Sequence, residues 1–332
     1  GVYKMNRRNG RRVRHCPDRC SDGENRLDVE IARRAALLAK TDLLTSMVGE
    51  FPELQGIMGR YYAQHENLDN DIAFAIEDHY KPRFAGDELP RNTVGVAVAL
   101  ADKLETLVGL FSIGEKPTGD KDPFALRRQA LGILRMLIDG KLNLKFSDVL
   151  RDALAQFPQA APDTLSALLE FCHDRLSVNL REQGASAQEV DAVLALSPSL
   201  LHEIPARLSA VQTFSALPEA PALAAANKRV SNILKDVPNT TLDATKLGHP
   251  TEKKLLQILE QARTAVNTAV KDQAWDKALA EIAKLQTPVA ELFSAVMVND
   301  PDLEVRKNRQ ALLMAVRDVV LEVADFAAFQ IS

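Results

Sequence analysis

The sequence predicts an all-α protein. Alanine and leucine are abundant, and aromatic residues make up 5% of the 332 residues, a composition that favours helices over sheets. Several stretches place apolar residues at i, i+3, i+4 and i+7, the spacing of one helix face, and the strand-like alternation of a sheet is absent from the sequence. The length leaves room for two domains, each with its own core.

The first 28 residues differ from the rest in their charge. Six cationic residues precede the first acidic residue, Asp18, and they are Lys4, Arg7, Arg8, Arg11, Arg12 and Arg14. A basic RNA-binding arm is one interpretation, but such runs are also typical of disordered tails, and we expect residues 1–28 to be a disordered or non-native segment. Cys16 and Cys20 with His15 resemble half of a zinc site. Because a second pair of ligands does not lie nearby in the sequence, we expect no metal.

Residues 29–145 are predicted to form a first helical domain. The helix expected between Val29 and Pro52 has one apolar face, which consists of Leu37, Leu44, Val48 and Phe51. A second helix is expected over 71–80, and the loop over 81–93 is rich in proline, glycine and charge. The next helix ends at Gly114, with Leu104, Leu107, Val108 and Phe111 along one stripe.

The stretch that follows predicts a central helix with an explicit start. Asp122 stands where an N-cap is expected and Pro123 at the first helical position, so the helix should run from Pro123 to about Ile138. Its residues are apolar on two sides, which is typical of a helix in the middle of a domain. Arg127 falls within one apolar face, where an unpaired charge is costly, so we expect it to pair with Asp102, Asp120 or Asp122.

Residues 146–332 are predicted to form a second helical bundle. Around residues 223–234 one face is apolar, and Lys228, Arg229 and Asn232 lie on the opposite side. From the residues alone, a solvated helix face is the simpler interpretation of these three.

The last helix is expected to begin at Asp300-Pro301. Arg309 falls within its apolar stripe, and we expect it to be paired inside the bundle. Arg306, Lys307 and Asn308 are expected at its exposed start. Because cations at a helix N-terminus oppose the macrodipole, these residues are a weak indication of a bound ligand.

Three segments, in the same order along the chain, closely resemble the β subunit of the bacterial two-subunit glycyl-tRNA synthetase. They are LLAKTDLLTSMVGEFPELQGIMGRYYA (37–63), GDKDPFALRRQALGILR (119–135) and AAANKRVSNIL (224–234). The resemblance implies an HD-type helical domain followed by a DALR-like anticodon-binding helical bundle, as in arginyl-tRNA synthetases. It also implies that Lys228, Arg229 and Asn232 face tRNA, because cations and amides suit phosphates and base edges. From the charge at the start of the last helix, and not from the resemblance, Arg306, Lys307 and Asn308 are a second candidate group for tRNA binding.

The resemblance further implies which subunit catalyses the reaction and which binds tRNA. In the family, adenylate formation and glycyl transfer belong to the α subunit. We therefore expect this chain to be the tRNA-binding portion of glycine–tRNA ligase, with no catalytic residue and no cofactor of its own, and ATP and magnesium at the α subunit. The expected partners are tRNA-Gly and the α subunit in a cytoplasmic hetero-oligomer, without a membrane. The net charge of −4 indicates that RNA binding must come from a local patch.

Two alternatives remain open from the sequence. The first is a degenerate HD-type metal-dependent phosphohydrolase joined to a helical bundle. Asp102 resembles the last metal ligand of that site, but neither His65 nor His79 precedes an aspartate, so Asp102 is better explained as the partner of an arginine. The His173-Asp174 pair lies in the next domain. The second alternative is a helical scaffold without catalytic function.

Overall fold

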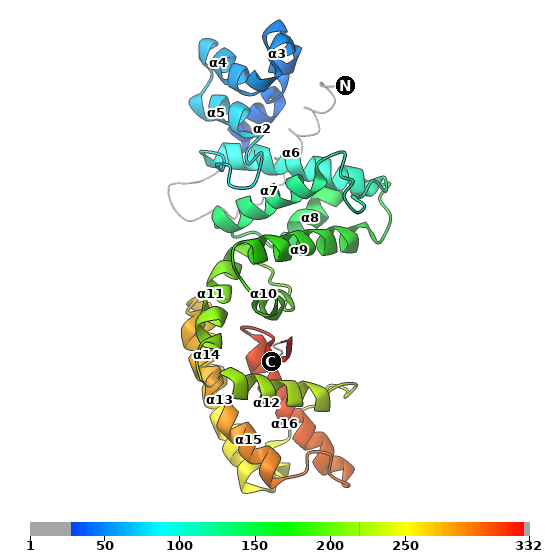
Figure 1. Ribbon diagram of the computed structural model, residues 1–332, viewed down its shortest axis with the longest axis vertical. Helices are drawn as coiled ribbons and strands as arrows, with labels where there is room; N and C mark the ends of the chain where they lie inside the picture. Colours follow the sequence, from blue (N-terminus) through cyan, green and yellow to red (C-terminus); the bar gives the residue numbers. More distant parts are fainter. Residues whose placement is uncertain (1–27, 219, 329–332) are drawn as a thin grey trace. The chain divides into compact units, whose positions relative to one another are not determined.

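The computed structural model describes residues 28–218 and 220–328 (Figure 1). The expectation of a disordered or non-native segment at 1–28 concerns residues that, apart from Asp28, lie outside this range. The prediction of an all-α fold is confirmed, since the described residues contain helices and only two isolated β-bridges.

The α-helices follow one another with short connections. Their bounds are α2 (Val29–Leu38), α3 (Ser46–Glu50), α4 (Ile57–His65), α5 (Asn70–Asp78), α6 (Thr93–Ser112), α7 (Leu126–Asp139), α8 (Phe146–Leu154), α9 (Thr164–Glu182), α10 (Ala187–Leu194), α11 (Ile204–Ser215), α12 (Ala220–Ile233), α13 (Pro250–Lys271), α14 (Trp275–Ala283), α15 (Gln286–Ala295) and α16 (Leu303–Leu321). Single turns of 3₁₀-helix occupy η2 (Thr41–Leu44), η3 (Pro52–Leu54), η4 (Leu201–Glu203), η5 (Ala244–Lys246) and η6 (Phe326–Ala328).

The chain forms two compact units. Among the described residues, the N-terminal unit comprises 28–176 together with 199–202, and the C-terminal unit comprises 177–198, 203–218 and 220–328. The chain therefore passes from one unit to the other within α9. The sequence predicts a domain boundary at 145/146, and both that boundary and the HD-type description of 29–145 stay predictions.

Small side chains build the first core of the N-terminal unit. Helices α2, α4, α5 and α6 pack closely through alanines such as Ala32, Ala36 and Ala73, all fully buried. The predicted apolar face between Val29 and Pro52 is wrong. The segment breaks into α2, η2 and α3, and Leu44 and Phe51 are 75% and 50% exposed. Close helix packing through alanine leaves the larger leucines of α2 and η2 on the outside.

The predicted start of the central helix is also wrong. Helix α7 begins at Leu126, three residues later than expected, because Ala125 has a left-handed backbone with φ of 53°. Asp122 still caps the helix, since its two carboxylate oxygens accept hydrogen bonds from the backbone N–H groups of Leu126 (2.7 Å) and Arg127 (2.9 Å). The turn of 122–125 therefore lies outside the helix.

Helix α13 is the centre of the C-terminal unit. It contacts α14, α15 and α16 through a buried stripe that includes Leu255, Leu259 and Val266. Helix α12 lies across α15 and α16 (Figure 1). It buries Leu223, Val230 and, beyond its end, Leu234. This packing fixes which side of α12 meets solvent.

Candidate nucleic-acid interface

The solvent side of α12 carries the three residues that the sequence singles out. Lys228, Arg229 and Asn232 are all exposed, as the helical spacing predicts. Lys235, just past the end of the helix and seven residues after Lys228, is exposed as well. We call these four residues the α12 basic face. Lys235 is not among the residues predicted from the sequence, although its spacing of two helical turns from Lys228 places it on the same side.

The cations of the α12 basic face form no described ion pair, although the exposed Asp236 follows Lys235 directly and makes Lys228 and Arg229 the two that are farther from a carboxylate in the sequence. No acidic residue occurs between 220 and 235. Within the described part of the chain, none of Lys228, Arg229 and Lys235 forms an ion pair. A cation without a neighbouring carboxylate retains its full attraction for a phosphate.

Arg229 is held in place by an aromatic ring. Its guanidinium carbon lies 4.1 Å from the centre of the Phe293 ring, which belongs to α15. Such a cation–π contact orients the guanidinium without neutralising its charge. Phe293 escaped the sequence analysis, because nothing in the sequence indicates that α15 packs beside α12.

The second predicted group, at the start of α16, is already engaged within the protein. Lys307 pairs with Glu304 (3.3 Å), and the Nε of Arg306 donates to the carbonyl of Asp300 (2.7 Å). The expected exposure of Asn308 is wrong, since its side chain is 6% exposed. Its amide accepts from the backbone N–H of Asp243 (2.8 Å) and donates to the carbonyl of the same residue (3.0 Å), so it fastens the loop before η5 to α16.

Arg309 lies inside the bundle, as its place in the apolar stripe indicates. Its guanidinium pairs with Glu252 (2.6 Å) and Asp300 (2.7 Å), and donates to the carbonyl of Met297 (2.8 Å). Helix α16 begins at Leu303 and is capped by Asp302, so both the cap and the first helical residue lie two residues later than the sequence suggested. These contacts are structural, and they leave the α12 basic face as the stronger candidate for RNA.

In the N-terminal unit the predicted charge pairings differ from the observed ones. Asp102 pairs with Lys40 (2.8 Å) rather than with an arginine. Arg127 donates to the carbonyl of Gly119, and among the described residues it forms no ion pair. The reason is that the late start of α7 turns Arg127 towards the loop rather than into the core.

Around Asp102 the buried groups are a poor set of metal ligands. His79 is fully buried, and burial lowers the pKa of its imidazole to about 4 although the Asp102 carboxylate opposes this shift. Lys103 is 5% exposed, and burial lowers the pKa of its amine to about 8. Two lysine side chains beside a single paired carboxylate oppose a divalent cation. Within the described residues, no group of three or more His, Cys, Asp or Glu side chains is arranged so that it could hold a metal ion.

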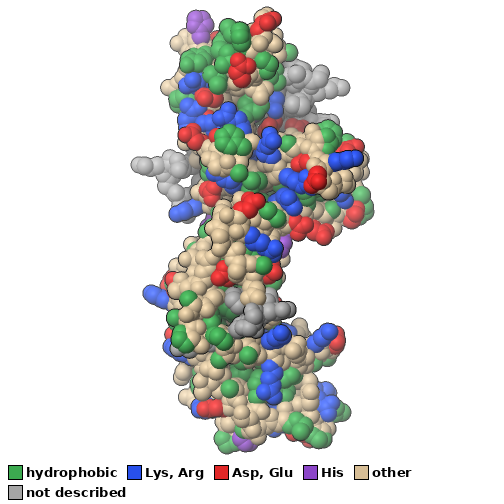
Figure 2. All heavy atoms as spheres, in the orientation of Figure 1, with side chains coloured by type: hydrophobic (Ala, Val, Ile, Leu, Met, Phe, Trp, Pro, Cys, Tyr) green, Lys and Arg blue, Asp and Glu red, His purple; other side chains and the backbone are tan. Residues whose placement is uncertain are grey.

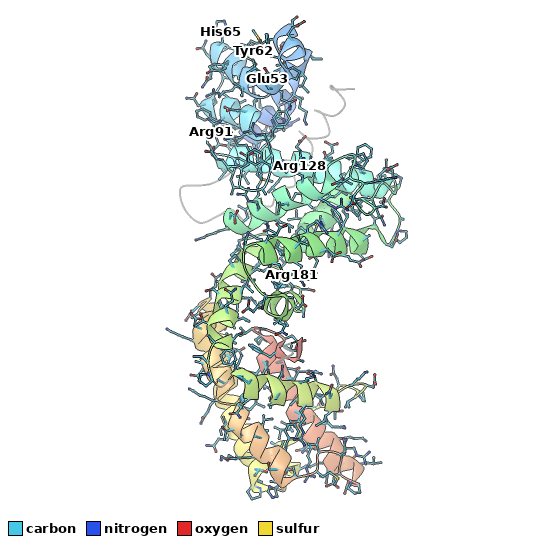
Figure 3. All side chains as sticks on the ribbon, in the orientation of Figure 1. Glu53, Tyr62, His65, Arg91, Arg128 and Arg181 are labelled. Atoms are coloured by element: carbon cyan, nitrogen blue, oxygen red, sulfur yellow. The ribbon has the colours of Figure 1, made fainter. Side chains whose placement is uncertain are left out.

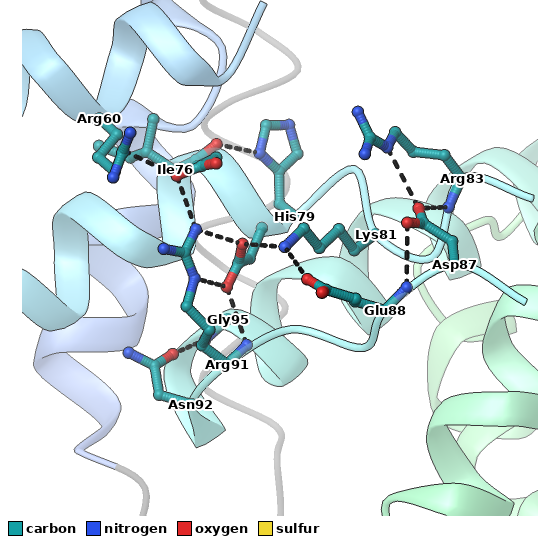
Figure 4. A network of polar contacts seen from close by, with 12 residues as sticks. Arg60, Ile76, His79, Lys81, Arg83, Asp87, Glu88, Arg91, Asn92 and Gly95 are labelled. Atoms are coloured by element: carbon teal, nitrogen blue, oxygen red, sulfur yellow. Dashed lines mark hydrogen bonds and ion pairs between the residues drawn. The ribbon is translucent and has the colours of Figure 1, made fainter.

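A network of ion pairs surrounds this region (Figure 4). Arg91 contacts both Asp78 (2.8 Å) and Glu77 (2.6 Å), and Lys81 pairs with Asp78 (3.2 Å). Burial opposes ionisation of Asp78, but hydrogen bonds from the side chain and backbone of Arg91 outweigh it and hold the pKa of this carboxyl below its ordinary value. The network ties the loop after α5 to α5 itself, which is a structural role.

The surface of the N-terminal unit mixes both signs of charge. On the face in Figure 2, cationic and acidic side chains lie interspersed over this unit. Arg128 of α7, labelled in Figure 3, is exposed. Arg181 of α9, labelled there as well, belongs to the C-terminal unit, where it pairs with Asp191 (3.0 Å). No helix of the described chain is both long and apolar enough to span a bilayer.

Comparison with known proteins assigns the helical unit that carries the α12 basic face to a class. Residues 223–325 match the DALR anticodon binding domain, so this unit belongs to the anticodon-binding class. Residues 7–195 match the family described as glycyl-tRNA synthetase beta subunit, and the match begins inside the basic segment. The chain belongs to the glycyl-tRNA synthetase beta subunit family.

Curated relatives agree with this assignment. The chain is 56% identical over 308 residues to the glycine–tRNA ligase beta subunit of Janthinobacterium sp. (strain Marseille), which covers 92% of this chain and 44% of the relative. It is 54% identical to that of Leptothrix cholodnii over 298 residues, with 89% of this chain and 42% of the relative covered. It is 55% identical to that of Methylobacillus flagellatus over 301 residues, with 89% of this chain and 42% of the relative covered. The chain thus spans less than half the length of these relatives.

Proposed function

We propose that this chain is the tRNA-binding portion of a glycyl-tRNA synthetase β subunit, and that its α12 basic face contacts the anticodon arm of tRNA-Gly. The observation that carries the proposal is the set of unneutralised cations on α12, within the helices that match an anticodon-binding domain. Lys228 and Lys235 offer cations to phosphates, while Asn232 offers an amide that both donates and accepts.

In this proposal the chain positions tRNA and does not carry out the reaction. Aminoacylation, with ATP and magnesium, takes place on the α subunit, and the two subunits form a cytoplasmic hetero-oligomer. The catalytic alternative is less favoured because Lys40 neutralises Asp102, the residue that the phosphohydrolase hypothesis requires as a ligand. The scaffold alternative predicts no specific affinity for RNA, and binding measurements therefore separate it from ours.

The test is a filter-binding titration of the purified chain against tRNA-Gly and a non-cognate tRNA at several salt concentrations. We expect Lys228→Ala and Lys235→Ala each to weaken binding and to reduce the slope of log K against log salt by about 0.7–0.9 for each phosphate that the protein no longer neutralises. Lys271→Ala, which removes an exposed lysine at the end of α13, is the matched control for net charge. Equal binding by the Lys228→Ala/Lys235→Ala double variant and the Lys271→Ala control would refute the proposal.

A further inference from the structure

Arg229 differs from the other exposed cations of the C-terminal unit in having an aromatic support. Its guanidinium carbon lies 4.1 Å from the ring centre of Phe293, and the side chain is nevertheless exposed. The guanidinium carbon therefore lies over the ring, while the residue as a whole remains exposed to solvent. By contrast, Arg263 on α13 is exposed but forms no described cation–π contact.

A supported guanidinium is suited to stacking. The group is planar, delocalised and weakly hydrated, so a flat apolar surface can lie on it at little cost in lost hydration. The Phe293 ring holds it in one position, which reduces the conformational entropy that binding would otherwise cost. RNA bases in single strands and loops stack on arginine planes and on aromatic rings in this way.

We infer that Arg229 and Phe293 form a platform on which one unpaired RNA base stacks, so that the α12 basic face takes nucleotides of a single-stranded loop rather than a duplex. This inference rests on the proposed function and specifies the kind of RNA structure that is bound. Asn232 lies one helical turn beyond Arg229 on the same side, where its amide can meet the edge of the stacked base or of its neighbour. Lys228 is adjacent and can meet the phosphate between them.

A duplex cannot use this arrangement. In A-form RNA the bases are stacked on one another and their major-groove edges lie too deep for side chains to reach. A duplex would meet the α12 basic face through phosphates alone, and for that purpose a lysine serves as well as an arginine. A difference in RNA affinity between the parent, which has arginine at position 229, and Arg229→Lys therefore indicates stacking.

The experiment uses the full 332-residue chain and two RNA probes. One probe is the anticodon stem–loop of tRNA-Gly with 2-aminopurine at single loop positions, and the other is a blunt RNA duplex of the same stem. Arg229→Lys keeps the charge but removes the planar group, and Phe293→Leu keeps an apolar side chain but removes the ring. Arg263→Lys is the matched control for the arginine exchange. Melting temperatures establish that each variant is folded.

We expect Arg229→Lys to weaken stem–loop binding by about 5- to 100-fold without changing its salt slope, as loss of one stacked base does. Phe293→Leu should weaken it by about 2- to 5-fold, the worth of an exposed cation–π contact. Quenching of 2-aminopurine at one loop position should be lost in Arg229→Lys and reduced in Phe293→Leu, and Arg263→Lys should bind as the parent does.

Several outcomes would overturn the platform. They are unchanged stem–loop binding by Arg229→Lys, unchanged quenching in Phe293→Leu, and duplex binding as tight as stem–loop binding. If Lys228→Ala still weakens binding in these cases, the platform fails and the proposed function stands. If Lys228→Ala and Arg229→Ala both bind like the parent, the proposed function fails as well.

Discussion

The charge cluster around Arg309 allows a stability prediction worked from individual contacts. Arg309 and Glu252 meet at 2.6 Å with side chains 13% and 3% exposed, and the second oxygen of Glu252 accepts from the backbone N–H of His249 (2.9 Å) at the start of α13. Arg309→Ala would leave the Glu252 carboxylate buried without its cation. Removing one partner of a buried ion pair lowers the free energy of unfolding by about 3–5 kcal/mol. This exceeds the attraction between the two charges, because the remaining charge stays buried and desolvated.

The expected change is large enough to resolve by thermal unfolding. A unit of about 150 residues loses about 2–4 °C of melting temperature per kcal/mol, so the transition of the C-terminal unit should fall by about 6–20 °C. Differential scanning calorimetry would separate it from the transition of the N-terminal unit. Lys307→Ala is the matched control, since Lys307 and Glu304 are 57% and 64% exposed and such surface pairs contribute about 0–1 kcal/mol.

A second substitution tests the physical cause. If the buried carboxylate is responsible, Glu252→Gln should be less harmful in the Arg309→Ala background than in the parent, because the amide carries no charge to leave unpaired. Equal melting temperatures for Arg309→Ala and Lys307→Ala would refute the reasoning. Additive effects of Arg309→Ala and Glu252→Gln would show that the two side chains do not interact.

Three further predictions concern the N-terminal unit. Asp122→Ala removes the acceptor of two backbone N–H groups at the start of α7 and should lower the free energy of unfolding, measured by chemical denaturation, by about 1–2 kcal/mol. Arg127→Ala removes one hydrogen bond to a carbonyl and should lower it by about 0.5–1.5 kcal/mol. A larger loss for Arg127→Ala than for Asp122→Ala would contradict the capping geometry. Because burial lowers the pKa of His79 from its ordinary 6.5 to about 4, the folded state holds this imidazole neutral, so its contribution is complete above pH 6.5 and is lost as the pH falls towards 4. The stability lost in this window is up to about 1.4 kcal/mol per pH unit, and His79→Gln should therefore flatten the dependence of melting temperature on pH. His65→Gln, at an exposed histidine (Figure 3), is the matched control. Finally, the chain should not hydrolyse nucleotides with added Mn²⁺, and turnover that Asp102→Ala abolishes would revive the phosphohydrolase hypothesis.

The helix faces that depend on local periodicity could be predicted from the sequence. The exposed side of α12 and the apolar stripe of α16 follow from a period of 3.6 residues, which can be counted along the sequence. The α12 residues that the sequence proposed for tRNA are exposed, and the buried position of Arg309 follows from the same pattern. Asp122 is recognisable as a cap because its side chain acts within four or five residues.

The errors arise where a partner is distant in the sequence or a backbone angle is unusual. Asn308 is buried because it binds Asp243, 65 residues away, and no local pattern reveals that contact. Lys40, the partner of Asp102, is 62 positions away in the sequence, and the prediction named an arginine as the partner because no local pattern reveals so distant a contact. The late start of α7 depends on the left-handed φ of Ala125, which an alanine rarely adopts. Leu44 and Phe51 are exposed because alanines, not leucines, fill the core beside α2.

The pairing of charges explains how a chain with a net charge of −4 can present a surface for RNA. At the start of α16 the cations lie beside Glu304 and Asp300, so a phosphate there would have to displace an interaction that the fold already makes. Within α12 itself no carboxylate occurs, and Lys228 and Arg229 form no described ion pair, so a phosphate at these two residues would displace only water and counterions. The net charge does not distinguish cations that are paired with carboxylates from cations that are unpaired. What decides the binding of a polyanion is which cations remain unpaired after folding. In the C-terminal unit, Lys228 and Arg229 on α12 lie on one helix side with the amide of Asn232 and with the aromatic support of Phe293.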